Sequence, residues 1–247
     1  MTSTLLPVPP DEAHLWYLLS DEIHDPDRLA SYERLLTPDE HARRARYVFE
    51  RNRHEYLLTR ALVRTVLSRY VPVAPEAWRF TPAAHGKPEI ASPRDIPPLS
   101  FNLTNTDGLI ACLVAFDRDV GVDVEDTQRK GETTGVADRF FSPSEVADLR
   151  GLPAEAQVDR FFDYWTLKEA YIKARGLGLA LPLAQFSFTI EPERVRIAFD
   201  PRLEDDPASW QFMQQSPTAR HRLAAAVRRG SGPDLRFVVR KVVPLAP

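Results

Sequence analysis

Two carboxylates separated by one residue are the first candidates for chemistry in this chain of 247 residues. The segment Gly121-Val122-Asp123-Val124-Glu125 alternates valines with acids. Because successive side chains of a β-strand point to opposite faces, Asp123 and Glu125 are predicted to share one face. Two such carboxylates can share a divalent cation, but a half-buried strand with a solvated acidic face gives the same pattern.

A third acid stands within an apolar stripe of the helix predicted over residues 161–175. The stripe recurs at helical spacing and consists of Phe162, Trp165, Glu169 and Ile172. An unpartnered carboxylate among apolar side chains is costly, so Glu169 needs a partner, and a metal ion would serve. Lys173 lies one turn further and offers the alternative, an ordinary Glu–Lys pair along the helix.

Arginine is concentrated in residues 43–69. This segment carries eight arginines and two acids, a charge of +6, although the whole chain has a net charge of −3. Arg53 and Arg60 share a helical stripe with Tyr56 and Val63, so at least one of them is expected to point inward. Arginine forks match phosphate oxygens, which favours a site for a small polyanion; a solvated basic face is the alternative.

The composition excludes several classes of protein. Proteins that coat nucleic acid are usually basic overall, and this chain has 32 basic against 35 acidic residues, so no nucleic acid is expected as a partner. One cysteine, Cys112, allows no internal disulfide. The N-terminal residues lack the pattern of a signal peptide, and no apolar run is long enough to span a bilayer, so we expect a cytoplasmic protein without a membrane partner.

The coarse pattern of elements alternates helices with short strands. Thr37-Pro38 and Ser142-Pro143 each read as the start of a helix, and the first helix is predicted to run to about residue 69. Proline-rich connections are expected over residues 72–98. The strands are predicted over residues 14–19, 99–104, 108–116, 120–124, 186–190, 195–199, 221–228 and 235–243.

The second half of the chain resembles the first. The two helix starts are 105 residues apart, and the long helices align at an offset of 109 residues, which pairs Arg60 with Glu169 and Arg64 with Lys173. The repetition predicts an α+β protein of two similar halves, residues 1–118 and 119–247, related by a pseudo-two-fold axis. Each half is expected to pack a long helix on a small antiparallel sheet, with the active site at the interface.

The strand and helix motifs together resemble those of the 4′-phosphopantetheinyl transferases. The resemblance rests on residues 121–125 and, about 40 residues later, on residues 165–173, with supporting segments around Lys87, Thr104 and Ser142. The length is similar to that of the monomeric, surfactin-synthetase-activating type, which implies a monomer. Members transfer the phosphopantetheine arm of coenzyme A to a serine of an acyl or peptidyl carrier protein domain, releasing adenosine 3′,5′-bisphosphate.

The resemblance implies roles for individual residues. Asp123, Glu125 and Glu169 would hold Mg²⁺, or alternatively Mn²⁺; Glu169 would also take the serine proton, and Lys173 would stabilise the leaving phosphate. The residues expected to contact coenzyme A are Arg53, Arg60, Lys87, Thr104, Asn105, Asp123, Lys168 and Lys173. The carriers implied are those of fatty-acid, polyketide and non-ribosomal peptide synthesis.

One departure from the family and two alternative functions follow. The family usually has a histidine that contacts the 3′-phosphate of coenzyme A where this chain has Asn105, and asparagine carries no charge. A non-catalytic module that binds coenzyme A or carrier proteins is the first alternative function. A metal-dependent phosphodiester hydrolase that uses the same carboxylates is the second.

Overall fold

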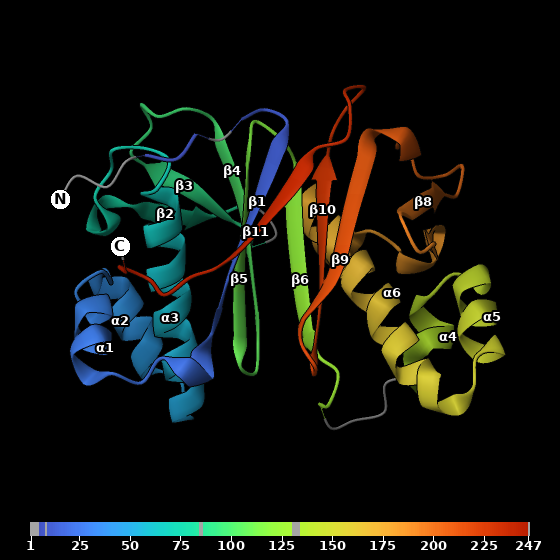
Figure 1. Cartoon of the computed structure of the whole chain (residues 1–247), viewed down its shortest axis with the longest axis horizontal. Helices are drawn as coiled ribbons and strands as arrows, with labels where there is room; N and C mark the ends of the chain where they lie inside the picture. The colour runs from blue at the N-terminus through green and yellow to red at the C-terminus, as the bar shows by residue number, and fades with distance from the viewer. Residues whose placement is uncertain (1–4, 8, 84–85, 130–133, 247) are drawn as a thin grey trace. The chain divides into compact units, whose positions relative to one another are not determined.

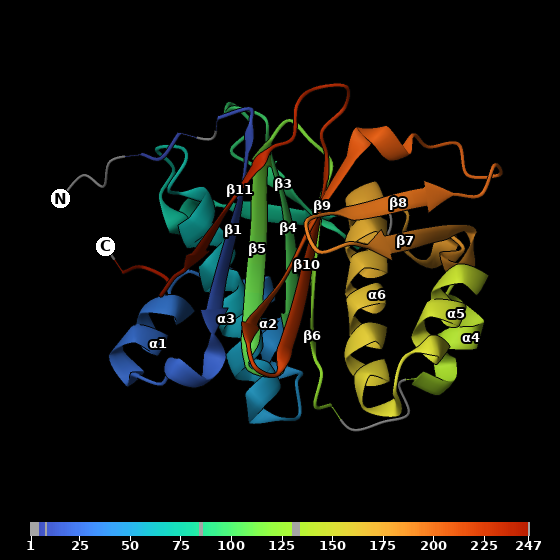
Figure 2. The same cartoon turned by 45° about the vertical axis from the view of Figure 1, so that its right-hand side comes forward.

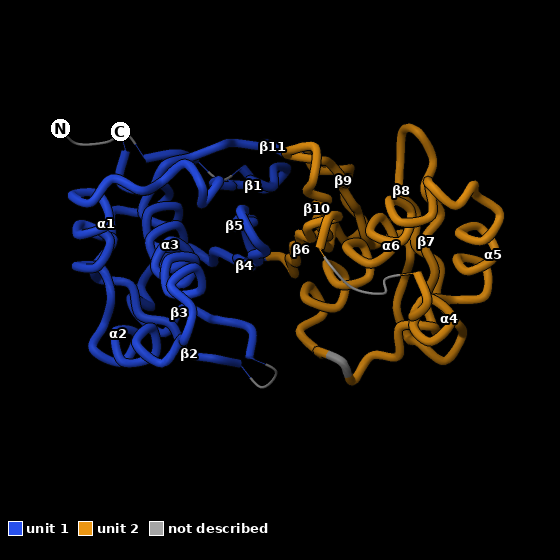
Figure 3. Tube along the Cα trace, turned by 90° about the horizontal axis from the view of Figure 1, so that it is seen from below, with its two compact units in different colours: residues 1–117, 237–247 blue, residues 118–236 orange. Residues whose placement is uncertain are grey.

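The computed structural model describes residues 5–7, 9–83, 86–129 and 134–246, which fall into two compact units (Figure 3). Unit 1 comprises Met1–Asp117 and Phe237–Pro247, and unit 2 comprises Arg118–Arg236. The sequence placed the division at nearly the same point. It assigned the last eleven residues to the second half, however, whereas in the structure they belong to unit 1.

Unit 1 packs helices on one four-stranded sheet (Figure 1). The sheet order is β11-β1-β5-β4, formed by β11 (Arg236–Lys241), β1 (Glu12–Leu19), β5 (Leu109–Phe116) and β4 (Leu99–Thr106). The helices are α1 (Pro26–Glu33), α2 (Pro38–Ala45) and α3 (Glu50–Leu67), and β2 (Arg79–Pro82) pairs with β3 (Pro88–Ser92). The inward faces of α3, β1 and β5 supply most of the buried apolar side chains of this unit.

The long helix predicted over residues 37–69 is wrong in one respect, because it is two helices. α2 ends at Ala45 and α3 begins at Glu50. The intervening segment ends in Val48 and Phe49, which are both exposed. Arg53 donates hydrogen bonds to the carbonyl oxygens of Tyr47 (2.8 Å) and Val48 (3.3 Å), so its side chain satisfies backbone groups that a continuous helix would have paired.

Unit 2 has the same kinds of layer (Figure 2). Its sheet has the order β6-β10-β9, formed by β6 (Val120–Asp126), β10 (His221–Arg228) and β9 (Trp210–Thr218). The helices are α4 (Ala137–Phe140), α5 (Pro143–Gly151) and α6 (Ala154–Arg175), and β7 (Phe186–Ile190) pairs with β8 (Val195–Phe199). The long helix α6 packs against β6 and β10. An α+β fold of two units, each with a small antiparallel sheet, is therefore confirmed.

Strand β9 was not predicted, and β3 lies within residues 72–98, where proline-rich connections were expected. β9 carries Gln214, Gln215 and Pro217, so it lacks the apolar run that indicates a strand. Because β9 lies at the edge of its sheet, a proline there removes no necessary hydrogen bond.

The short helices of both units begin with the same chemistry. Thr37 caps α2 and Ser142 caps α5. In each case the glutamate three residues later, Glu40 or Glu145, accepts a hydrogen bond from the backbone N–H of the cap residue. Proline follows each cap, where its missing N–H costs nothing. The two helix starts predicted from the sequence are thereby confirmed.

Each capping glutamate also binds a buried cation on the long helix of its own unit. Glu40 Oε2 lies 2.6 Å from Arg64 Nη2, and Glu145 Oε2 lies 2.8 Å from Lys168 Nζ; both basic side chains are fully buried. Arg64 lies over the ring of Phe80 in β2.

Lys168 lies correspondingly over the ring of Phe186, the first residue of β7. These contacts pair Arg64 with Lys168, an offset of 104 residues, and not with Lys173 as the alignment of the two helices had it. Each unit thus contains a capping glutamate paired with a buried cation that lies over a phenylalanine ring. The pseudo-two-fold relation between them stays a prediction.

Candidate active site

A row of residues on β6 faces a row on α6 within unit 2. Gly121, Asp123 and Glu125 alternate along the strand, and the facing residues of the helix include Trp165 and Lys173. A Cβ at Gly121 would overlap the carbonyl oxygen of Ala170 and the amide nitrogen of Ala174. Only glycine lets β6 approach α6 this closely, and this approach brings the two carboxylates of the strand against the helix.

Hydrogen bonds join the two rows. Lys173 Nζ donates to Asp123 Oδ1 (2.6 Å) and to the carbonyl oxygen of Val122 (3.2 Å), and Trp165 Nε1 donates to Glu125 Oε1 (3.1 Å). The sequence alternative of a Glu169–Lys173 pair is therefore not what the helix uses, because the lysine turns to the strand. The prediction that Asp123 and Glu125 share one face agrees with these contacts.

The charge of Asp123 raises the pKa of two neighbouring glutamates. Burial and then the charge of Asp123 raise the pKa of Glu125 to about 7, although Arg129, which forms an ion pair with Glu125 at 2.9 Å, lowers it. Burial and Asp123 also raise the pKa of Glu169, against the opposing charge of Lys173. Asp123 is thus electrostatically coupled to both glutamates, and the site concentrates negative charge where water is scarce.

The described part of the chain contains no group of three or more His, Cys, Asp or Glu side chains close enough to hold a metal ion. The sequence prediction that Asp123, Glu125 and Glu169 hold one cation stays a prediction. In the structure Asp123 contacts Lys173, and Glu125 contacts Arg129 and Trp165.

Lys168, which the sequence predicted to contact coenzyme A, is buried in the interior of unit 2. Its ammonium group is fully buried, is paired with Glu145, and donates to the carbonyl oxygens of Leu183 (2.8 Å) and Phe186 (2.7 Å). Three acceptors satisfy its three donors, so contact with coenzyme A is contradicted by its position. Lys168 instead fastens α6 to α5 and to the start of β7.

A second candidate site is a pocket of about 360 Å³ in unit 1. Arg60 of α3 and Asn105 of β4 both line it, as the sequence prediction of a shared role requires. The sequence did not single out Arg43 and Tyr56, which also line it; the guanidinium groups of Arg43 and Arg60 lie 5.9 and 5.0 Å from the centre of the Tyr56 ring. The pocket therefore combines cations with an aromatic face.

Three other predicted residues of unit 1 are not part of this pocket. Arg53 is engaged by Tyr47, Val48 and Glu50, so its predicted contact with a phosphate is contradicted by its hydrogen bonds. Lys87 precedes β3 and is half-buried, and Thr104 on β4 is buried. Neither Lys87 nor Thr104 lines the pocket.

Glu55 was missed by the sequence reasoning. It lies on α3, lines the pocket of unit 1, and is only 9% exposed. Burial raises the pKa of its carboxyl group, and the charge of Arg51 lowers it. The available signal was an acid within the arginine-rich segment, but the sequence could not show that this acid faces a cavity.

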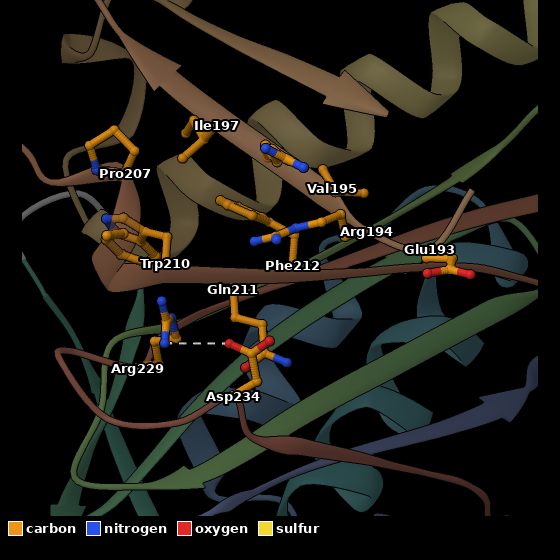
Figure 4. A pocket seen from close by; sticks show the side chains of 12 residues that line it. Glu193, Arg194, Val195, Ile197, Pro207, Trp210, Gln211, Phe212, Arg229 and Asp234 are labelled. Carbon is orange, nitrogen blue, oxygen red and sulfur yellow. Dashed lines mark ion pairs between the residues drawn. The ribbon is translucent and has the colours of Figure 1, made fainter. Parts of the chain in front are cut away.

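Unit 2 holds another pocket, of about 310 Å³, between β8, β9 and the segment after β10 (Figure 4). Trp210, Phe212 and Ile197 line it, and Arg229 at its edge is paired with Asp234 at 3.4 Å. None of the residues that the sequence singled out lines this pocket. It contributes nothing to the candidate active site.

Comparisons with known proteins agree with these features. A family model described as "4'-phosphopantetheinyl transferase superfamily" matches residues 119–227, and one described as "4'-phosphopantetheinyl transferase, N-terminal" matches residues 25–116. The chain is 34% identical to 4'-phosphopantetheinyl transferase HetI of Nostoc sp. over 87% of this chain and 89% of that protein.

Two transferases of Bacillus subtilis are similarly related. Identity to 4'-phosphopantetheinyl transferase Sfp is 34%, covering 64% of this chain and 68% of that protein. Identity to the transferase ffp is also 34%, covering 68% of this chain and 70% of that protein.

Proposed function

The chain belongs to the 4′-phosphopantetheinyl transferase superfamily, and from this premise we propose that it moves the phosphopantetheine arm of coenzyme A to a serine of a carrier protein domain. The observation that carries this proposal is the face shared by β6 and α6, where acids and Lys173 meet around Asp123. The relatives described above are transferases, and they give no support to a binding module or a hydrolase.

A divalent cation fits the chemistry of this face. Asp123, Glu125 and Glu169 present carboxylate oxygens, the ligands that Mg²⁺ prefers, and a cation would offset the repulsion by which Asp123 raises the pKa of both glutamates. We propose these three residues as its ligands, with Mg²⁺ or Mn²⁺ as the ion. When bound, the ion would neutralise charge on the pyrophosphate.

Two residues of α6 are proposed to act on the reacting groups. Glu169 is half-buried, and burial raises the pKa of its carboxyl group, which makes its carboxylate a stronger base toward a serine hydroxyl. Lys173 places a positive charge beside Asp123, where it can donate a hydrogen bond to the phosphate that leaves. The helix carries both groups one turn apart, which holds them in a fixed relation.

The nucleotide half of coenzyme A is proposed to bind in the pocket of unit 1. Arg43 and Arg60 supply positive charge, and Tyr56 and Asn105 supply hydrogen-bonding and ring contacts. The guanidinium group of Arg60 forms an ion pair of 3.9 Å with Glu40, and its Nε atom has no hydrogen-bond partner among the described residues, so a fork onto a phosphate is proposed.

The remaining proposals concern the carrier partners, the oligomeric state and the cellular location. Carriers of fatty-acid, polyketide or non-ribosomal peptide synthesis are proposed as partners, and the enzyme is proposed to act as a monomer in the cytoplasm. Among the described residues no helix combines the length and apolar character needed to cross a bilayer.

The test is transfer to an apo carrier domain. Purified protein, coenzyme A and Mg²⁺ should add the mass of the arm to the carrier, as measured by intact-mass spectrometry. Glu169→Gln should reduce the rate by about a hundredfold or more, because the general base is lost.

Glu155→Gln is the matched control, since Glu155 is exposed in the first turn of the same helix. It should transfer at the normal rate. An unmodified carrier with the unaltered protein would contradict the proposed function. A normal rate with Glu169→Gln would remove that residue from the mechanism.

A further inference from the structure

Both carboxylate oxygens of Glu125 accept hydrogen bonds from side chains of unit 2. Oε1 accepts one from Trp165 Nε1 (3.1 Å), and Oε2 accepts one from Arg129 Nη1 (2.9 Å). The two donors differ in charge, because an indole N–H is neutral and a guanidinium group is a cation. A metal ion bound to Glu125 would therefore be repelled by Arg129 but not by Trp165.

Arg129 reaches Glu125 from the turn that follows β6. Its backbone amide donates to the carbonyl oxygen of Asp126 (3.2 Å), and its side chain returns to the carboxylate four residues earlier. The guanidinium group also lies 5.2 Å from the centre of the Phe162 ring. The side chain of Arg129 is 42% exposed, so water can solvate it when the pair opens, and exposed ion pairs of this kind add little to stability.

The indole ring of Trp165, in contrast, is held by other aromatic rings. It stacks on Phe161, with 5.7 Å between ring centroids, and meets Phe140 edge-on at 5.8 Å. Of the two donors to Glu125, Arg129 is thus the one that can leave the carboxylate without disturbing packed side chains.

The charge of Arg129 acts on Glu125 as well as its hydrogen bond. Burial and the charge of Asp123 raise the pKa of Glu125 to about 7, and among the cations that oppose them Arg129 has a stronger effect than Lys173. Arg129 thereby supplies part of the positive charge that a divalent cation would supply at the same carboxylate.

We propose that Arg129 competes with the divalent cation for Glu125 and so lowers the affinity of the active site for that cation. Binding of the cation then separates Arg129 from Glu125. This inference rests on the proposed function, since it takes Glu125 as one of the ligands of the cation. Arg129 acts through Glu125 and is a positioning residue.

The experiment measures Mn²⁺ binding by the full chain. Electron paramagnetic resonance of unbound Mn²⁺ gives the dissociation constant with coenzyme A at saturation, and coenzyme A without protein supplies the reference titration. Arg129→Met should lower the dissociation constant by about fivefold, because the competing charge is removed while an unbranched side chain is kept. Arg129→Lys retains the charge and should bind Mn²⁺ as the unaltered protein does.

Arg150→Met is the matched control. Arg150 of α5 is also 42% exposed and pairs with Asp138 at 3.1 Å, so its replacement removes an exposed ion pair of unit 2 away from Glu125. Mn²⁺ binding should not change. A second control adds Arg129→Met to Glu125→Gln, where the arginine has no carboxylate to compete for and its removal should bring no gain in affinity.

Thermal unfolding establishes that each variant is folded. A dissociation constant for folded Arg129→Met that is equal to or above that of the unaltered protein overturns the proposal, as does the same gain in the Glu125→Gln background. Unchanged Mn²⁺ binding by Arg129→Met together with normal transfer to a carrier contradicts the role of Arg129 alone. Absence of transfer by the unaltered protein contradicts the proposed function.

Discussion

At the scale of single residues, the candidate active site gathers negative charge that the folded chain does not fully neutralise. Glu125 illustrates this, because burial and Asp123 raise its pKa to about 7 in spite of its partner Arg129. Such a group protonates more readily in the folded chain than in the unfolded chain. Proteins commonly accept this loss of stability where charge is needed for binding or catalysis.

The first residue-scale prediction concerns pH and stability. Since the folded pKa of Glu125 lies above its ordinary value of 4.5, the folded state holds the extra proton between about pH 4.5 and pH 7. The free energy of unfolding therefore falls as pH rises through that window. Glu125→Gln should stabilise the protein by ~2 kcal/mol at pH 8 and by much less at pH 4.5.

Urea unfolding at both pH values, with a chelator present, measures this difference. Glu76→Gln is a suitable control, because Glu76 is exposed and lies in unit 1. An equal change in stability at pH 4.5 and pH 8 for Glu125→Gln would show that its carboxyl group does not titrate in this window.

The sequence identified the polar residues of β6 and α6 that face one another, because the backbone of a strand or a helix fixes which side chains share a face. Asp123 and Glu125 share a face for that reason, and Trp165 reaches them from α6. It could not locate Lys168, whose partners come from other segments of the chain, or Arg53, whose side chain bonds backbone carbonyl groups exposed by the break between α2 and α3. Long side chains choose partners by tertiary packing, which spacing along the sequence does not reveal.

At the scale of elements, the site depends on how closely β6 approaches α6. Gly121→Ala should destabilise the protein by about 2 kcal/mol or more, since the added methyl group meets backbone atoms of α6 that cannot rotate away. Transfer activity should fall with it, because Asp123 would move away from Lys173.

Gly151→Ala is the matched control for this change. Gly151 is the last residue of α5, and a Cβ there meets open space, so the substitution should be neutral or stabilise by about 0.5 kcal/mol. Thermal unfolding of both variants makes the comparison. Equal melting temperatures would contradict the close approach at Gly121.

A second element-scale prediction concerns the buried pair that joins α5 to α6. Lys168→Met should destabilise the protein by about 3 kcal/mol or more, because Glu145 is left as an uncompensated buried charge. Adding Glu145→Gln should recover a large part of the loss, since the residual charge is removed. Chemical denaturation of the two variants tests this, and equal stabilities would show that the pair contributes no coupling.

Elements that begin with strong local chemistry were predictable from the sequence, and those that depend on their neighbours were not. Thr37 and Ser142 mark helix starts because a cap followed by proline is a local signal. The end of α2 at Ala45 was missed, because the residues that follow still read as helical and the side chain of Arg53 supports the break. β9 was missed because an edge strand tolerates glutamines and a proline.

At the scale of the whole molecule, unit 1 is completed by the last part of the chain. β11 lies beside β1, the amide of Val242 donates to the carbonyl oxygen of Tyr17 (2.9 Å), and the hydroxyl of Tyr32 donates to that of Pro244 (2.8 Å). Because these contacts lie within unit 1, removing them should weaken that unit and spare unit 2.

Deletion of residues 237–247 tests this dependence. Amide hydrogen exchange should accelerate in β1 and α1, since both lose partners, and should stay slow in β6 and α6, which belong to unit 2. Unchanged protection in β1 would show that β11 adds nothing to the stability of unit 1.

The return of residues 237–247 to unit 1 also sets an order of events during synthesis. A ribosome releases the chain from its N-terminus, so β6, α6 and β10 have all emerged while β1 still lacks its outer neighbour. The half of the protein that is translated first is therefore the half that matures last. Until β11 emerges, one side of β1 is an open sheet edge, which another chain can pair with.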